Sequence, residues 1–212
     1  IEGIRIDDAA AIRKAGFDPR AVKVIVFSHA HLDHVGAIAA LQAATGAAVL
    51  GRGADGRAMR RGHGGADDPQ AAGIRPFAPV PATRIIGDTA VVRVGPLALH
   101  AIPNPGHTPG GTSWRWRSCE RGRCRTLVYA DSLTAVSSPG FKFSGDTGLV
   151  LGFKHSIATV AALPCDILLT PHPEASNLWE RKAAGTFADN AACRRYAQAA
   201  GAAEGGAAAA AS

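Results

Sequence analysis

The sequence predicts an α/β protein: one domain in which a mixed β-sheet is layered with helices on its outer faces. Helix and strand patterns alternate at both ends of the chain, and a series of short strands separated by Gly, Pro or Asp turns lies between them. The chain of 212 residues suits one domain, is long enough to bury a core and contains no internal repeat.

The first 50 residues alternate between the two patterns. Apolar residues at helical spacing predict two helices, which end at Gly16 and Gly46, and β-branched apolar stretches predict two buried strands. In chain order, we expect a helix at 8–15, a strand at 22–27, a helix at 35–44 and a strand at 47–50.

The rest of the chain begins with a Gly- and Pro-rich loop region at 52–82, which has room for a short helix at most. Strand patterns then dominate from residue 84 to 129, and Ala and Gly fill the low-complexity tail, 202–212, which we expect to be frayed. The expected elements are strands at 84–86, 91–94, 97–102, 112–117 and 126–129, a helix at 154–163 ended by Pro164, a strand at 166–170 and a helix at 186–200.

The composition argues against nucleic acid and membranes as partners. The formal net charge is +6 with all eight histidines neutral, but no block of consecutive Lys and Arg carries it. No apolar stretch approaches the roughly 20 residues of a membrane span. The chain begins at Ile1 without a visible signal peptide, so we expect a mature form or a fragment, and the compartment stays open.

Metal chemistry is predicted by one short stretch, Ser28-His29-Ala30-His31-Leu32-Asp33-His34, on the loop after the second expected element. Three imidazoles and a carboxylate within six residues are ligands suited to zinc. The spacing of two lets His29 and His31 share one metal, while Asp33 and His34 follow a bend and could serve a second.

Two distant histidines complete these sets. His107 lies in the turn Asn104–Gly111 and His172 lies between Pro171 and Pro173, each directly after an expected strand. Flanking Pro and Gly residues fix the direction of such a side chain, as metal binding requires. Together the six residues predict two sites of three ligands each.

Other candidate motifs carry less weight. His63 in a Gly-rich loop, His100 within a strand and His155 at a helix start are interpreted as residues outside the site. The segment Gly51–Gly56 matches the dinucleotide pattern G-x-G-x-x-G, but it lacks a βαβ unit and an acidic partner, so we treat the match as chance. Neither Ser-x-x-Lys nor Gly-x-Ser-x-Gly occurs, so serine acyl-enzyme chemistry has no motif.

The four cysteines form no Cys-x-x-Cys pair, which leaves two disulfides or four buried thiols. The segment Cys119–Cys124 is too polar for a core, which favours disulfides and therefore an oxidising compartment. A Cys119–Cys124 bridge would close a tight loop and a Cys165–Cys193 bridge a longer one.

At this point the chain resembles the metallo-β-lactamase superfamily over about residues 5–200, through H-x-H-x-D-H, a Gly-His turn and a late His. Three stretches are similar to the class B, subclass 3 β-lactamases: Pro105–Trp114, Tyr129–Ala135 and Leu168–Asn177. The resemblance implies a four-layer αββα sandwich. It also implies that both cysteine pairs match bridges found in some members, which places the protein in the periplasm.

The resemblance also implies a role for each site residue. Ser132 stands where other subclasses have a cysteine ligand, and with Thr134 it would face the substrate carboxylate. Some relatives bridge their metals with an aspartate after the corresponding strand, but Asp131, which follows that strand here, would stay outside the ligand set. One zinc would be held by His29, His31 and His107 and a second by Asp33, His34 and His172. A metal-bound hydroxide, oriented by Asp33 as catalytic residue, would then hydrolyse the β-lactam amide bond, so the expected protein is a monomeric antibiotic-resistance enzyme.

Family members carry a further N-terminal segment that builds part of one sheet, so the resemblance implies a truncated metallo-β-lactamase domain at 1–201 that folds poorly alone. The enzyme alternatives are a lactonase, a thioester hydrolase or a phosphodiesterase on the same site. The alternative that is not an enzyme is an inactive metal-binding relative.

Overall fold

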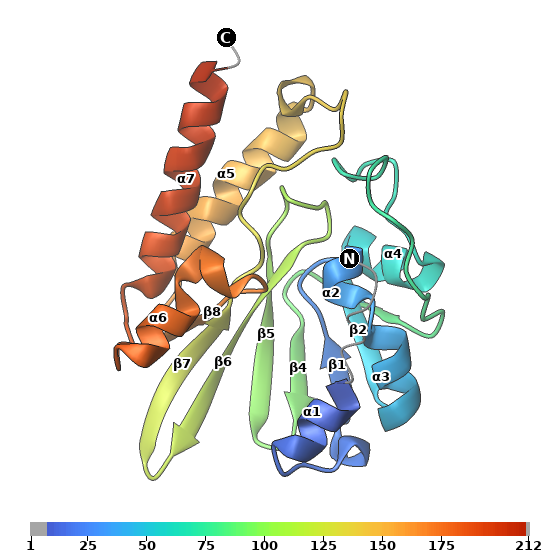
Figure 1. The fold of residues 1–212 in the computed structure, drawn as a ribbon, viewed down its shortest axis with the longest axis vertical. Coiled ribbons are helices and arrows are strands. Elements are labelled where there is room, and N and C mark those ends of the chain that lie inside the picture. Colours follow the sequence, from blue (N-terminus) through green and yellow to red (C-terminus); the bar gives the residue numbers. More distant parts are fainter. Residues whose placement is uncertain (1–7, 211–212) are drawn as a thin grey trace.

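The computed structural model describes residues 8–210, which form two β-sheets with helices on their outer sides (Figure 1). One sheet has three strands and the other has five. Helices from the first half of the chain cover the small sheet, and helices from the second half cover the large one. The expected four-layer αββα arrangement is therefore confirmed.

The small sheet, with strand order β1-β2-β3, is parallel throughout. Its strands and their helices come from the first 86 residues: α1 (Asp8–Lys14), β1 (Val24–Val26), α2 (Leu32–Val35), α3 (Ile38–Thr45), β2 (Ala48–Arg52), α4 (Gly53–Arg61) and β3 (Arg84–Ile86).

The large sheet, with strand order β4-β5-β6-β7-β8, is an antiparallel meander to which β8 adds in parallel. Its strands are β4 (Val91–Val94), β5 (Leu97–Pro103), β6 (Thr112–Glu120), β7 (Arg123–Tyr129) and β8 (Ile167–Leu169). The helices are α5 (Thr147–Ala162), α6 (Leu178–Ala183) and α7 (Ala192–Ala210), and α5 and α7 lie side by side (Figure 1).

Buried side chains between the two sheets hold the site in place. Trp114 on β6, only 2% exposed, packs with Leu50 of β2, and its Nε1–H donates to the carbonyl of Phe27 at 2.9 Å. The amide of Thr112 donates to the carbonyl of Ser28 at 2.8 Å. These bonds fix the end of β1 beside the start of β6, so the loops that follow β1 and precede β6 must meet.

Several expectations from the sequence were wrong in detail, among them the start of the last helix, α7, which lies at Ala192 and not at residue 186. β3 was expected to belong with the strands that follow it, but it pairs with β2. The partner of so short a strand depends on contacts with residues far away in the sequence. α5 begins at Thr147, seven residues early, since Asp146 caps it by accepting a hydrogen bond from the Leu149 amide. The metal-binding stretch is not all loop, because its last part forms α2. The low-complexity tail, expected to be frayed, is helical as far as Ala210, consistent with the high helix propensity of alanine, and its last two residues lie outside the described residues.

Both expected disulfides, Cys119–Cys124 and Cys165–Cys193, are present. The first joins β6 to β7 across the hairpin, which extends further than the pattern predicted. The second ties the start of β8 to α7 inside the core under the large sheet.

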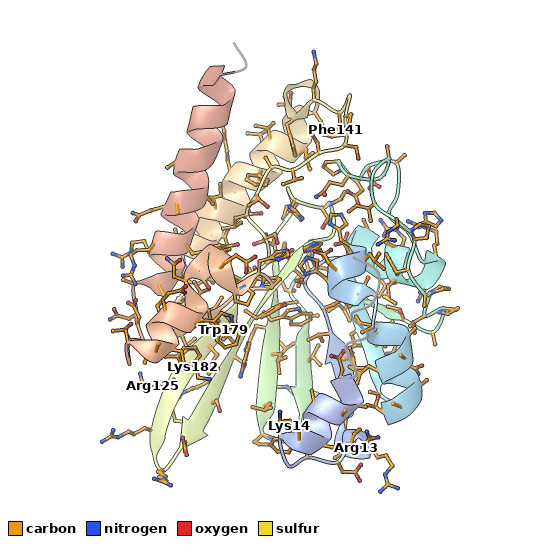
Figure 2. All side chains as sticks on the ribbon, viewed as in Figure 1. Arg13, Lys14, Arg125, Phe141, Trp179 and Lys182 are labelled. Carbon is orange, nitrogen blue, oxygen red and sulfur yellow. A yellow bond between two sulfur atoms is a disulfide. The ribbon has the colours of Figure 1, made fainter. Side chains whose placement is uncertain are left out.

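Basic side chains are scattered over this fold. In Figure 2, Arg13 and Lys14 lie on α1, far from Arg125 on β7 and Lys182 on α6. Among residues 8–210, no helix combines the length and apolar character that crossing a membrane requires.

Candidate metal centre

Three strand ends bring the six predicted ligands together. His29 and His31 follow β1, Asp33 and His34 lie on α2, and His107 lies in the turn between β5 and β6. His172 follows β8, directly before a 3₁₀ turn, Pro173–Ser176. The parallel pairing of β7 with β8 and the contact between β1 and β6 place all these ends at one edge of the sandwich.

The first donor cluster consists of His29, His31 and His107. All three are buried, and one ring nitrogen from each lies within 4.8 Å of the others. The ring centroid of His29 lies 4.6 Å from that of His31 and 4.6 Å from that of His107. Three buried imidazoles with converging nitrogens can occupy three positions of a tetrahedral zinc site, leaving one open.

The other nitrogen of each ring is held by an acceptor behind it, which fixes both the ring plane and the atom that faces the cluster. Asp68, in the loop after α4, was not singled out in the sequence, and nothing in its local sequence marks it. The pairs are His29 Nδ1 with Asp131 Oδ1 at 2.7 Å, His31 Nε2 with Asp68 Oδ2 at 3.0 Å, and His107 Nδ1 with the Thr134 carbonyl at 2.7 Å.

His29 gives the most direct test of whether a metal fits. Its side chain is wholly buried, yet its Nε2 makes no hydrogen bond with any residue that the structure describes. Buried polar atoms are almost always paired, so such an atom needs an explanation. Burial also lowers the pKa of His29 to about 4, against the opposing effect of Asp131, so the ring is neutral and Nε2 has a free lone pair. A metal ion fits this atom.

The second cluster consists of Asp33, His34 and His172, whose donor atoms also lie within 4.8 Å of one another. Asp33 Oδ2 is 3.2 Å from His34 Nε2 and 3.5 Å from His172 Nε2. The Asp33 and His172 side chains are 61% and 47% exposed, so this cluster opens to solvent. The His34 hydrogen bond lowers the pKa of Asp33, which keeps the carboxylate ionised.

The two clusters are adjacent, because the ring centroids of His29 and His34 are 3.9 Å apart. The arrangement offers two three-ligand sites side by side, one buried and one open. Two such metals can act together on one substrate.

The residues predicted to contact substrate lie beside the first cluster. Ser132 is buried, and its amide donates to Asp131 Oδ1 at 2.8 Å. Thr134 is exposed, and its Oγ1 lies 3.3 Å from His107 Nδ1. Asp131 itself lies on the Nδ1 side of His29, behind the ring.

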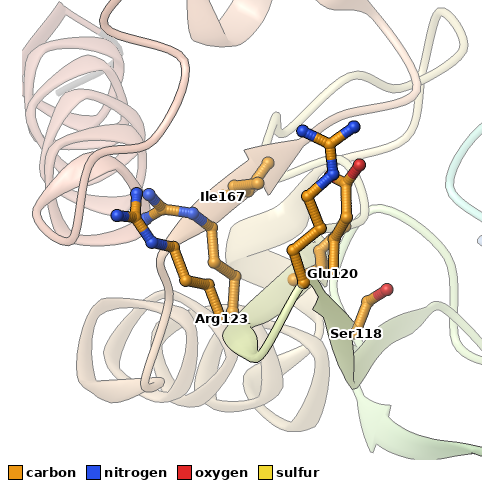
Figure 3. Close-up of a pocket in the computed structure, with 7 residues that line it drawn as sticks. Ser118, Glu120, Arg123 and Ile167 are labelled. Carbon is orange, nitrogen blue, oxygen red and sulfur yellow. The ribbon is translucent and has the colours of Figure 1, made fainter.

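The other three histidines belong to neither donor cluster. His63 contacts the carbonyl of Gly64, His100 lies on β5, and His155 lies on α5 beside Thr159. An open cavity of about 680 Å³ between the β6–β7 hairpin and Ile167 is also distinct, since none of the six predicted ligands lines it (Figure 3).

The chain is similar to known proteins in both sequence and fold. Residues 2–121 match the family described as the metallo-beta-lactamase superfamily. The structure is similar to that of MEM-A1, a subclass B3 metallo-beta-lactamase from a soil metagenome library, with 44% identity, a TM-score of 0.89, and coverage of 92% of this chain and 77% of that one. It is also similar to the metallo-beta-lactamase MIM-1 from Novosphingobium pentaromativorans, with 42% identity, a TM-score of 0.86, and coverage of 91% and 71%.

A curated relative carries a different activity. The hydroxyacylglutathione hydrolase of Anaeromyxobacter dehalogenans (strain 2CP-C) is 34% identical over 141 residues. The match covers 66% of this chain and 43% of that protein, so it spans less than half of the relative's length.

Proposed function

Because this chain belongs to the metallo-β-lactamase superfamily, we propose that it hydrolyses the amide bond of β-lactam antibiotics with two zinc ions. The observation that carries the proposal is the pair of adjacent three-donor clusters, in a fold similar to subclass B3 enzymes over more than nine-tenths of the chain.

The zinc ligands would be His29, His31 and His107 at the first site and Asp33, His34 and His172 at the second. Bound there, zinc would supply hydroxide at neutral pH and polarise the carbonyl of the substrate.

The protein's own groups prepare this chemistry. Asp131, Asp68 and the Thr134 carbonyl accept hydrogen bonds from the outer ring nitrogens, which turns the inner nitrogens toward the cluster. The inner nitrogen of His107, Nε2, also lies 3.3 Å from the side-chain amide nitrogen of Gln70 and can accept a hydrogen bond from it. The carboxylate of Asp33 is ionised and exposed, so it would accept a hydrogen bond from the attacking water and orient it. The hydroxyls of Ser132 and Thr134, beside the first cluster, would bind the carboxylate of the β-lactam.

Parallel assays with the zinc-loaded protein test the proposal. The substrates are nitrocefin, an acyl-homoserine lactone and S-lactoylglutathione, at matched concentrations. A kcat/KM for nitrocefin far above the other two supports a β-lactamase. Preference for the lactone or thioester contradicts it.

A thioester hydrolase is the second candidate, because the curated relative is a hydroxyacylglutathione hydrolase. The same two metals could serve a thioester carbonyl. Greater similarity to MEM-A1, 44% identity over 92% of this chain against 34% over 66% for the hydroxyacylglutathione hydrolase, favours the β-lactam substrate.

The two disulfides support location in an oxidising compartment, which we propose is the periplasm, with the protein acting as a monomer on small-molecule substrates. Thiol titration of protein isolated from that compartment, under denaturing conditions, should find none of the four cysteines free. Four titratable thiols would contradict the location.

A further inference from the structure

The segment Gly51–Gly56, at the join of β2 and α4, contributes nothing to either donor cluster, yet it lies directly beside the loops that carry the first one. It is the stretch that matches a dinucleotide pattern. Contrary to the expectation from sequence, β2, α4 and the parallel strand β3 do form a βαβ unit around it, so the lack of such a unit is no longer a reason to dismiss the match. Its glycines serve close packing: a Cβ on Gly56 would meet the carbonyl oxygen of Gly51 at 2.5 Å. α4 is therefore pressed against β2 with little freedom to move.

Asp55, in the first turn of α4, is only 4% exposed and bonds to both loops. Its Oδ2 accepts hydrogen bonds from the Ala30 amide at 3.2 Å and from Thr108 Oγ1 at 2.6 Å. Its Oδ1 accepts one from the Gly110 amide at 3.1 Å. Ala30 lies between two first-site histidines, and Thr108 follows the third, so one carboxylate joins both backbones that carry the cluster.

The contact between Asp55 and the His107 loop is tight. A Cβ on Gly110 would lie 2.3 Å from the Asp55 backbone nitrogen, so only glycine allows this approach. Arg52 strengthens the contact from the same segment, since its guanidinium donates to the Gly111 carbonyl at 2.6 Å and to Thr112 Oγ1 at 3.2 Å. The far side of that guanidinium pairs with the exposed Asp88 at 2.8 Å.

We propose that Asp55 is a positioning residue that sets the spacing between the His29–His31 loop and the His107 loop, and so selectively sets the zinc affinity of the first site. This inference rests on the proposed zinc function. Without the carboxylate, two amides and one hydroxyl lose a buried acceptor, and the two loops lose their shared anchor. Among residues 8–210, no hydrogen bond or ion pair joins Asp55 to Asp33, His34 or His172, so that site should keep its affinity.

Zinc binding, measured without substrate, tests this by competition with a chromophoric chelator. D55N and D55A are each made in a H172A background, which leaves the first site intact, and in a H107A background, which leaves the second. D88N is the matched control, because Asp88 pairs with Arg52 but touches neither loop.

In the H172A background, D55A should raise the zinc dissociation constant about 10- to 100-fold, the usual effect of losing such a supporting group, and D55N less because its amide oxygen can still accept. In the H107A background, D55A and D55N should each change the zinc dissociation constant less than about threefold. D88N should change it less than about threefold in either background. Urea unfolding of the metal-free proteins identifies any variant that fails to fold. If D55A fails to fold, the zinc affinity of D55N tests the proposal.

Equal loss of affinity at both sites, or no loss at the first, would overturn the proposal. If the unmutated protein binds two zinc ions but hydrolyses no β-lactam, the proposed function is wrong, while the role of Asp55 in setting the zinc affinity of the first site still stands. If it binds no zinc, both fail.

Discussion

The two disulfides should contribute unequally to stability. Cys165–Cys193 joins residues 28 positions apart, and Cys119–Cys124 joins residues five apart. If a disulfide acts by restricting the unfolded chain, the loop lengths give about 3.5 kcal/mol for the first and about 2 kcal/mol for the second. Replacing both cysteines of a pair with alanine removes one bridge and keeps the other.

The surroundings widen this difference. Cys165 and Cys193 are buried with Val160 and Leu168, so their loss also removes packed atoms from the core. Cys119 and Cys124 are exposed and face each other in the β6–β7 ladder, whose hydrogen bonds hold the hairpin without the bridge.

Urea unfolding of the zinc-loaded protein under oxidising conditions measures both effects. C165A/C193A should lower the free energy of unfolding by about 3.5 kcal/mol or more, and C119A/C124A by about 2 kcal/mol or less. Equal losses, or a larger loss from the hairpin pair, would refute the reasoning from loop length and burial.

Three further outcomes follow from the site. H31A should bind one zinc fewer per chain and lose most β-lactam hydrolysis, whereas H155A, on α5 outside both clusters, should match the unmutated protein in metal content and turnover. D131A should weaken zinc binding about 10- to 100-fold because Nδ1 of His29 loses its acceptor at 2.7 Å; unchanged affinity in a chelator titration would argue against that role. G106A should cost more than about 2 kcal/mol in urea unfolding, because φ is +140° and the new Cβ would lie 2.1 Å from a Phe153 ring carbon, while G87A, with open space around it, should cost less than about 1 kcal/mol.

The predicted ligands were accessible from sequence because their chemistry is local. His29, His31, Asp33 and His34 are four metal-binding side chains in one stretch, and His107 lies in a Gly- and Pro-rich turn. Such a density of ligands at strand ends is informative whatever the exact strand boundaries are. The layered fold followed from the order of helix and strand patterns in the same way.

The supporting groups could not be found from sequence. Asp68 and Asp55 are ordinary acidic residues in the region expected to be mostly loop, and only the folded chain brings them to His31 and to the loop backbones. The Thr134 carbonyl, which accepts from His107, has no sequence signature at all. Such long-range partners depend on tertiary packing, as does the pairing of β3 with β2.

Nitrocefin hydrolysis through a cycle of metal removal and return tests the central proposal most directly. Exhaustive chelation should abolish turnover, and titration with zinc should restore it fully at two ions per chain. Turnover that survives chelation, or a fully zinc-loaded protein that leaves nitrocefin intact, would contradict a two-zinc β-lactamase.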